Sequence, residues 1–284
     1  MNRAEDAFRA DIVEIGRRMY ARGYVASNDG NISIRLDDAT ILTTPKSVSK
    51  GFMTPDMMVV VDLDGKKIRG TRDASSELLM HLEVYKNRSD TRAVVHAHPP
   101  IATGFAVAGI PLDRAVLAEV VTTLGSIPIA EYGTPSTPEL PAAVRKYIKA
   151  HDGLLLANHG ALTIGPDVYA AYYKMETIEH FAKISLVTRQ LGRENLLSRE
   201  EVHRLQELRG NYGIKSPAPI CADGSEPASN DPASCQIVEA PASRGARLVP
   251  TDPADLDGEI RLSYRELTAL IEDAVKALLG GQHG

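Results

Sequence analysis

Between residues 1 and 215, short apolar runs alternate with amphipathic helical patterns, and this alternation constrains the fold more than any other feature of the sequence. The runs with the length and composition of strands are 31–35, 40–43, 58–62, 93–98, 126–130 and 154–157. The helical patterns are an apolar stripe of Phe8, Ile12, Ile15 and Met19, and the stretches 76–86, 138–150 and 167–191. Strands interleaved with helices predict an α/β domain, in which helices cover a sheet.

The composition changes abruptly after this domain. Residues 216–258 hold seven of the 17 prolines, and alanine, serine, aspartate and glycine make up most of the rest. Such a segment buries too little apolar surface to offset the entropy lost on ordering, so we expect a disordered linker. Residues 259–281 regain a helical pattern, with Ser263 and Glu266 as a capping box before an apolar stripe that begins at Leu267. We therefore expect a single amphipathic helix on a tether.

Net charge and apolar content exclude several classes of partner. The net charge of −5 gives no electrostatic attraction to nucleic acid, and no basic run suggests a membrane surface. No stretch approaches the roughly 18 apolar residues of a membrane span. Cys221 and Cys235 lie in the polar segment without a metal-binding spacing, which is typical of free thiols in a reducing compartment. We expect a cytoplasmic protein that binds neither nucleic acid nor membranes.

Three histidines stand at the ends of apolar runs. His96 and His98 close the run 93–98, and residues two apart in a strand face the same side. His159 follows the run 154–157 and precedes a glycine. A single histidine at a strand end is more often an ordinary polar residue of the rim, and that alternative stays open for each of them. Together, three neutral imidazoles with a free fourth position describe a catalytic zinc site.

Two turns carry residues suited to binding an anion. Ser75-Ser76-Glu77 stands where a helix is expected to begin, and hydroxyls with free backbone N–H groups at such a point bind phosphate. The simpler interpretation is that a serine caps the helix and Glu77 complements its dipole. Residues 28–33, Asn-Asp-Gly-Asn-Ile-Ser, form a tight turn into a strand, which alone also fits an ordinary hairpin.

Taken together, these motifs resemble the class II aldolase and adducin family, over residues 5 to about 215. Within the family, the pattern is most similar to that of L-fuculose-1-phosphate aldolase and the deoxypentulose-phosphate aldolases. The motifs that stand in the family's order and spacing are Gly30-Asn31-Ile32-Ser33, Thr44-Pro45, Ser75-Ser76-Glu77, His96-Ala97-His98 and Asn158-His159-Gly160.

The resemblance implies a three-layer α/β/α domain that assembles as a cyclic homotetramer with active sites between subunits. It makes His96, His98 and His159 ligands of Zn²⁺, and makes Glu77 both a ligand of the resting metal and the general acid/base. It also implies a phosphate site and a C-terminal tyrosine that reaches a neighbouring subunit's active site. The corresponding residues are Gly30, Asn31, Lys46, Ser47, Ser75 and Ser76 for the phosphate, and Tyr212 for the tyrosine.

The implied reaction is zinc-dependent retro-aldol cleavage of a ketose 1-phosphate, such as L-fuculose 1-phosphate, into dihydroxyacetone phosphate and a small aldehyde such as lactaldehyde. Zinc would act as a Lewis acid on the charge left on the ketone fragment, and Glu77 would move the proton at C3. Two positions depart from the family pattern. Lys46 and Ser47 stand where the fuculose enzyme has a smaller Thr-Gly pair, and no tyrosine follows Pro111, which leaves Glu119 as the candidate replacement.

Three other functions fit the same motifs. A pentulose-phosphate 4-epimerase of the family uses the same chemistry, although those enzymes carry aspartate at the position of Glu77. A methylthioribulose-phosphate dehydratase shares the histidines, and a metal-free scaffold like the head domain of adducin shares the fold. The tail resembles the encapsulation peptides that take enzymes into bacterial microcompartments, so we hypothesise that residues 259–281 bind a shell protein.

Overall fold

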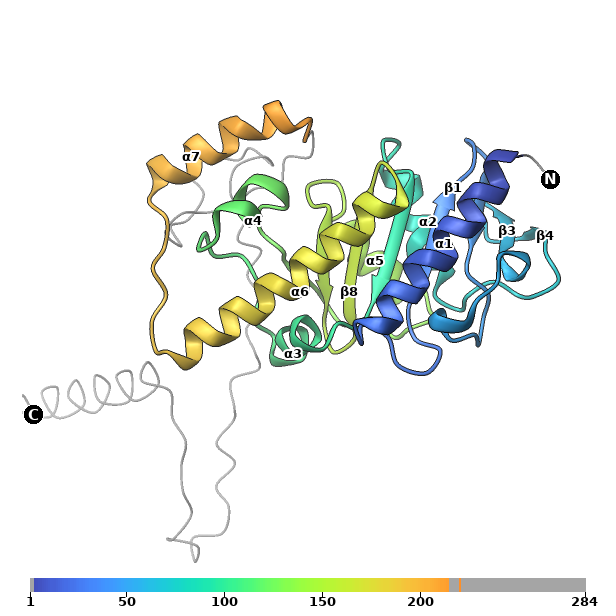
Figure 1. Ribbon diagram of the computed structural model, residues 1–284, viewed down its shortest axis with the longest axis horizontal. Helices are drawn as coiled ribbons and strands as arrows, with labels where there is room; N and C mark the ends of the chain where they lie inside the picture. The colour runs from blue at the N-terminus through green and yellow to red at the C-terminus, as the bar shows by residue number, and fades with distance from the viewer. Residues whose placement is uncertain (1–2, 215–219, 221–284) are drawn as a thin grey trace, which may run out of the picture. The chain divides into compact units, whose positions relative to one another are not determined.

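The computed structural model describes residues 3–214 and residue 220, and Figure 1 shows their arrangement. The helices are α1 (Arg3–Ala21), α2 (Leu78–Asn87), α3 (Pro100–Ala108), α4 (Ala118–Thr123), α5 (Glu139–Arg145), α6 (Val168–Gln190) and α7 (Arg199–Leu208). The strands are β1 (Asn31–Arg35), β2 (Thr40–Thr43), β3 (Val59–Asp62), β4 (Lys67–Arg69), β5 (Ala93–Ala97), β6 (Ile129–Ala130), β7 (Gly153–Leu156) and β8 (Gly160–Gly165). Short 3₁₀ helices are η1 (Lys50–Phe52), η2 (Pro55–Met57) and η3 (Arg209–Tyr212). The expected linker over 216–258, apart from Ile220, and the expected helix over 259–281 lie outside the described residues, as do both cysteines.

One mixed sheet contains the described strands in the order β4-β3-β2-β1-β5-β8-β7-β6. Neighbouring strands are antiparallel except for β6 and β7, which are parallel. Strand β8 is antiparallel to both β5 and β7, so β5 and β7 run in the same direction and end at the same edge of the sheet. The two histidine-bearing runs therefore meet at that edge, although the sheet is not of the parallel type.

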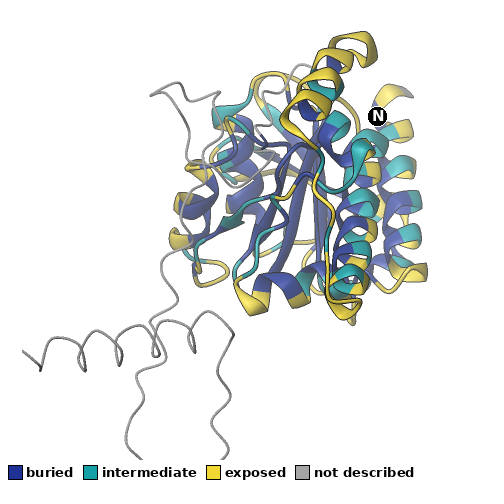
Figure 2. Cartoon of the chain, turned by 90° about the vertical axis from the view of Figure 1, so that its left-hand side faces the viewer, coloured by how far each residue is buried: buried dark blue, intermediate teal, exposed yellow. Residues whose placement is uncertain are grey.

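Helices cover both faces of this sheet (Figures 1 and 2). On one face, Ile12 of α1 and Phe105 of α3 belong to a core that also contains residues of α6 and Val95 of β5. On the other face, Leu82 of α2 and residues of α5 share a second core with Val94. Consecutive residues of β5 thus enter opposite cores, as expected for a strand that is buried on both faces. The predicted three-layer α/β/α architecture is confirmed.

The strongest sequence patterns match the observed elements most closely. The strands predicted at 31–35 and 40–43 have those bounds, and the helix predicted over 167–191 is α6, where the Asp167 side chain accepts a hydrogen bond from Ala170 N. Weaker patterns overestimated length: the strand at 126–130 is only β6, and the helix at 138–150 is only α5. Strands β4 and β8 and helices α3, α4 and α7 were not predicted from the sequence.

A small apolar cluster lies apart from the two main cores. It contains Ala115, Val121 near the end of α4, Val202 of α7, and Ile220. Ile220 is 6% exposed, so one residue inside the range expected to be a linker packs against the domain.

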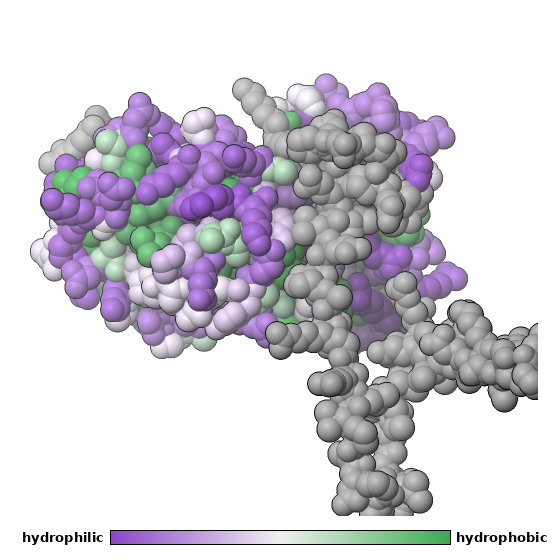
Figure 3. All heavy atoms as spheres, turned by 180° about the vertical axis from the view of Figure 1, so that it is seen from behind, coloured by the Kyte–Doolittle hydropathy of each residue, from purple (hydrophilic) through white to green (hydrophobic). Residues whose placement is uncertain are grey.

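Hydrophilic side chains predominate on the face shown in Figure 3, with smaller apolar areas between them. Among the helices of the described residues, none combines the length and the apolar character needed to cross a bilayer. Large exposed apolar side chains, such as Phe52 and Leu191, occur at separate elements, as is normal for a protein surface.

Candidate metal centre and active site

The three predicted histidine ligands converge at one point. His96 lies in β5, His98 follows the end of that strand, and His159 lies in the turn between β7 and β8. The Nε2 atoms of His96 and His98 are 3.1 Å apart, and one ring nitrogen from each of the three residues lies within 4.8 Å of the others. Residues two apart in β5 therefore do present both rings to the same side, and β7 brings the third ring to them.

The turn that carries His159 is closely packed against the end of β5. A Cβ atom at Gly160 would lie 2.5 Å from the carbonyl oxygen of Ala97 and 2.6 Å from Cδ2 of His98, so only glycine fits here. Asn158 adopts a left-handed conformation with φ of 55°, which asparagine tolerates better than most residues. The Asn-His-Gly motif thus encodes the backbone geometry that seats His159 against the other two rings.

The surroundings of two of these rings suit metal binding, for which an imidazole must offer a nitrogen lone pair. His96 is fully buried, and its Nδ1 lies 2.8 Å from the carbonyl oxygen of Ala161. In the tautomer with its proton on Nδ1, His96 donates to that carbonyl and offers the Nε2 lone pair to a metal ion. Burial, with smaller electrostatic contributions from the neighbouring His96 and His159, lowers the pKa of His98 to about 3 and favours its neutral form. Three converging imidazole nitrogens fit a divalent metal ion.

Glu77, the residue immediately before α2, lies beside this cluster. Its Oε1 lies 2.9 Å from Nε2 of His159, and its Oε2 lies 3.4 Å from Nε2 of His96. Asn31 Nδ2 donates to Oε2 at 3.0 Å and to Ser75 Oγ at 3.2 Å. Burial alone would raise the pKa of Glu77, but its electrostatic and hydrogen-bonding interactions with His96 and His159 outweigh burial and hold that pKa below its usual range. Glu77 is therefore an ionised carboxylate that is aimed at the histidine cluster.

A cleft of about 190 Å³ opens beside the cluster. The predicted site residues that line it are Gly30, Lys46, Ser47, Ser75, Ser76, Glu77 and His98. It is also lined by Asn28, Asp29, Pro45, Lys50, Pro135 and Ser136. Ser47 and Ser136 have left-handed φ angles of 57° and 66°, a strained conformation that is concentrated at functional sites. The cleft therefore gathers hydroxyl groups and two lysines next to the histidine cluster.

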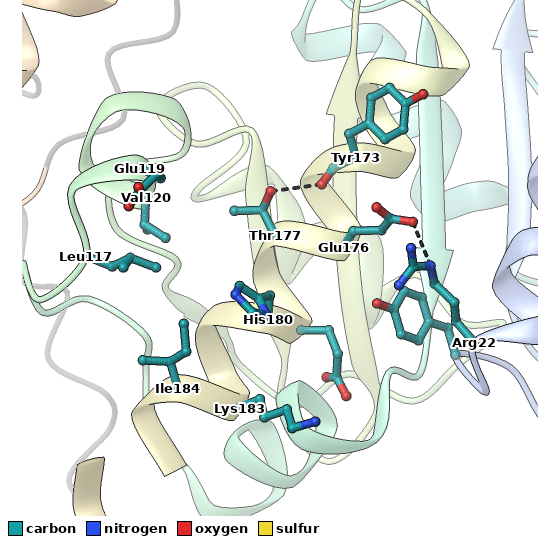
Figure 4. A pocket seen from close by; sticks show the side chains of 12 residues that line it. Arg22, Leu117, Glu119, Val120, Tyr173, Glu176, Thr177, His180, Lys183 and Ile184 are labelled. Atoms are coloured by element: carbon teal, nitrogen blue, oxygen red, sulfur yellow. Dashed lines mark hydrogen bonds and ion pairs between the residues drawn. The ribbon is translucent and has the colours of Figure 1, made fainter. Parts of the chain in front are cut away.

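Three residues singled out in the sequence do not line this cleft. Asn31 is 1% exposed, and its amide group contacts Glu77 and Ser75 instead of lining the cleft. Tyr212, in η3, is 67% exposed and does not line the cleft of its own chain. Glu119 lines a different cleft, of about 870 Å³, together with residues of α6 (Figure 4). Neither Tyr212 nor Glu119 reaches the histidine cluster within one chain.

Sequence reasoning missed two residues of the site. Asp29 Oδ2 lies 3.5 Å from Nδ1 of His98, the position of a carboxylate that orients a metal-binding imidazole. It stands in the motif 28–33, so a signal for it was present. Lys50 is 2% exposed and lines the cleft, but an isolated lysine in a polar run normally indicates a solvent-exposed residue.

Comparison with known proteins identifies the family. The family of the class II aldolase and adducin N-terminal domain matches residues 10–186. L-fuculose phosphate aldolase of Methanococcus maripaludis is 35% identical over 181 residues, which cover 64% of this chain and 97% of that protein. A 3-oxo-tetronate 4-phosphate decarboxylase of Pectobacterium atrosepticum is 31% identical over 188 residues, which cover 65% of this chain and 86% of that protein. A solved L-fuculose 1-phosphate aldolase has a TM-score of 0.67 at 28% identity, covering 71% of this chain and 95% of that one.

The chain belongs to the class II aldolase and adducin family. With its aldolase relatives, this membership makes it an enzyme of the aldolase class, a lyase. Aldolases of class II depend on a metal ion, and the described residues contain a suitable cluster in His96, His98 and His159. The family resemblance that five motifs indicated is confirmed.

Proposed function

We propose that the chain catalyses reversible retro-aldol cleavage of a ketose 1-phosphate, such as L-fuculose 1-phosphate, to dihydroxyacetone phosphate and a small aldehyde such as lactaldehyde. The observation that carries this proposal is the convergence of three imidazoles and Glu77 beside a cleft lined by serine hydroxyls and two lysines. The cluster suits a metal and a proton transfer, and the cleft suits a phosphate. The similarity to two L-fuculose phosphate aldolases supports the choice of substrate.

We assign the metal as Zn²⁺, held by His96, His98 and His159. Imidazole nitrogens with an additional carboxylate are a donor set that zinc prefers, and calcium and magnesium prefer oxygen ligands. The bound ion supplies a Lewis acid for the negative charge that develops on the ketone fragment. Asp29 beside His98, and the Ala161 carbonyl beside His96, keep these rings oriented.

Glu77 is placed to move the proton at C3 of the substrate. In condensation, the ionised Glu77 carboxylate takes a proton from C3 of dihydroxyacetone phosphate. In cleavage, the electron pair of the broken C3–C4 bond remains on C3, and Glu77, which has first taken up a proton from solvent, returns a proton to C3. The hydrogen bond from Asn31 fixes the carboxylate for this transfer. A proton must also leave the C4 hydroxyl, and we assign this transfer to Tyr212 of a second copy in a cyclic homotetramer. The exposure of Tyr212 outside its own chain's cleft supports that assignment.

A panel assay tests the reaction. Zinc-loaded protein is incubated with fuculose 1-phosphate, rhamnulose 1-phosphate, 5-deoxyribulose 1-phosphate and the methylthio counterpart of the last, and release of dihydroxyacetone phosphate is measured. Release from at least one substrate, abolished by a chelator and restored by Zn²⁺, is the expected result. A zinc-loaded protein that releases none from any of the four is not the aldolase proposed here. An epimerised or dehydrated product would identify the pentulose-phosphate epimerase or the methylthioribulose-phosphate dehydratase instead.

A second candidate is decarboxylation of a 3-oxo acid phosphate. The similarity to the Pectobacterium 3-oxo-tetronate 4-phosphate decarboxylase favours it, and a metal beside Glu77 would also suit the carbanion that loss of CO₂ leaves. Release of CO₂ from 3-oxo-tetronate 4-phosphate, measured beside the sugar panel, separates the two reactions. Purified protein with no bound metal and no activity in either assay would favour an adducin-like scaffold.

We further propose that this enzyme is cytoplasmic and that residues 259–281 take it into a bacterial microcompartment by binding a shell protein. The support comes from the sequence, in the Ser263–Glu266 capping box and the apolar stripe after it. A reporter fused to residues 216–284 should form foci in a shell-forming host, and Leu267→Asp or Leu270→Asp should disperse them. Diffuse fluorescence of the unaltered fusion would contradict this targeting role.

A further inference from the structure

Lys50 holds a fixed position because η1, in which it lies, packs closely on α1. A Cβ atom at Gly16 of α1 would lie 2.7 Å from the carbonyl oxygen of Lys50. A Cβ atom at Gly51 would lie 2.5 Å from the Tyr20 ring of the same helix. Glycine on both surfaces lets the two backbones approach closely, which side chains at these positions would prevent. The Lys50 side chain therefore starts from a rigid backbone, unlike a lysine on an open loop.

The ammonium group of Lys50 links two loops beside the cleft, one that contains Asn28 and one that contains Val48. Its Nζ donates to the carbonyl oxygen of Asn28 at 2.9 Å and to that of Val48 at 2.7 Å. Asn28 belongs to the turn before β1, and Val48 follows the cleft residue Ser47. A lysine ammonium has three N–H donors, so two are used and one remains for a ligand.

The charge of Lys50 is buried without a matching carboxylate. The side chain is 2% exposed, and no ion pair links it to an acidic group among the described residues. Burial lowers the pKa of Lys50 to about 8, and the charges of Asp29 and Glu77 act against this shift. A buried cation whose protein partners are neutral carbonyls is costly, and such groups concentrate at functional sites. A dianionic phosphate in the cleft would offset that cost.

We propose that Lys50 is a specificity residue for the phosphorylated end of the substrate, with its charge and remaining N–H given to a phosphate oxygen. This inference rests on the proposed sugar-phosphate function and adds a buried cation to the serine hydroxyls of the cleft. Lys46 lines the same cleft but is exposed, so its charge is screened by water. Lys50 therefore contributes more to phosphate affinity than Lys46 does.

The test compares binding of inorganic phosphate by the zinc-loaded wild type, Lys50→Met and Lys50→Gln, using calorimetry. Lys149→Met, at an exposed position outside the cleft, is the matched control. Loss of a charge-assisted hydrogen bond should weaken phosphate binding about 10- to 100-fold in both Lys50 variants. Zinc content and melting temperature identify a variant that has not folded. Phosphate affinity within about twofold of wild type in a folded Lys50 variant, or no phosphate binding by the wild type, overturns the inference.

A crystal structure of the wild type with inorganic phosphate gives an answer that does not depend on the variants. We expect a phosphate oxygen within about 3 Å of Lys50 Nζ. A phosphate bound out of reach of Nζ would overturn the inference. If the Lys50 variants lose phosphate affinity but the wild type cleaves no ketose 1-phosphate, the role of Lys50 stands and the proposed reaction is wrong.

Discussion

The two sides of the cleft are built differently. On the metal side, His96 and His159 come from a strand and a turn of the sheet, and the His96 side chain is fully buried. On the anion side, Lys46 and Ser47 are exposed residues of a loop, and buried Lys50 ties that loop to its neighbour. A metal requires ligands held to a fraction of an ångström, which a hydrogen-bonded sheet provides. A phosphate is bound by several weaker donors, and loops can vary these from one relative to another.

Glu77 both lines the cleft and contacts the histidines. We expect its replacement to have the largest effect on activity. Glu77→Gln keeps the shape and the contact with Asn31 but removes the group that accepts the C3 proton. Exchange of the C3 proton of dihydroxyacetone phosphate with deuterated water should slow about 10²–10⁴-fold, as measured by NMR. Glu200→Gln, on the exposed face of α7, is the control. Exchange at the wild-type rate in Glu77→Gln would remove Glu77 from the mechanism.

On the metal side, the loss of a single histidine should sharply weaken zinc binding. His96→Ala removes one of three nitrogen donors, so zinc affinity should fall by at least about 100-fold, more than the loss of an outer contact would cause. The measurement is elemental analysis after dialysis, with about one zinc per chain expected for the wild type. His203→Ala, at an exposed position on α7, should leave zinc unchanged. Undiminished zinc in His96→Ala would show that the metal is bound elsewhere.

The metal side was also the more predictable from sequence. His96 and His98 share a side of their strand because of local geometry, which the spacing alone reveals. The Asn-Gly pair around His159 likewise signals a tight turn. Whether neighbouring strands run parallel or antiparallel could not be predicted from the residue spacing. Short apolar runs look alike in parallel and antiparallel sheets, and β8, which aligns β5 with β7, follows the turn so closely that its pattern was overlooked.

The anion side was predicted only in part, because burial there depends on tertiary packing. The serines and Lys46 were found through their family motifs, and they do line one cleft. The phosphate role of Asn31 stays a prediction, and the donation from its side-chain amide to Glu77, 46 positions away, was not predicted. Lys50 was missed because its burial follows from the contact of η1 with Gly16 of α1. No local pattern encodes such contacts.

Gly160 gives a way to distort the metal side without removing a ligand. In Gly160→Ala, the new Cβ would collide with the Ala97 carbonyl, so the turn carrying His159 must shift. We expect a loss of unfolding free energy of about 1–3 kcal/mol, together with weaker zinc binding. Gly104→Ala in α3 is the matched control, because nothing lies within 4 Å of a Cβ there. Thermal unfolding with and without zinc measures both effects, and equal behaviour of the two variants would contradict the close packing of this turn.

Lys46 should show the smallest effect, since the anion side uses an exposed cation at that position. In Lys46→Met, the lost charge is one that water and salt already screen, so KM for the phosphorylated substrate should rise only about two- to tenfold, with kcat unchanged. The rise should shrink as salt concentration increases, because screening then weakens the wild-type interaction as well. Steady-state kinetics at low and high salt, with Lys149→Met as the control, measures this difference. A fall in kcat for Lys46→Met would instead place Lys46 in the chemical step. It would contradict the assignment of the anion side to substrate binding alone.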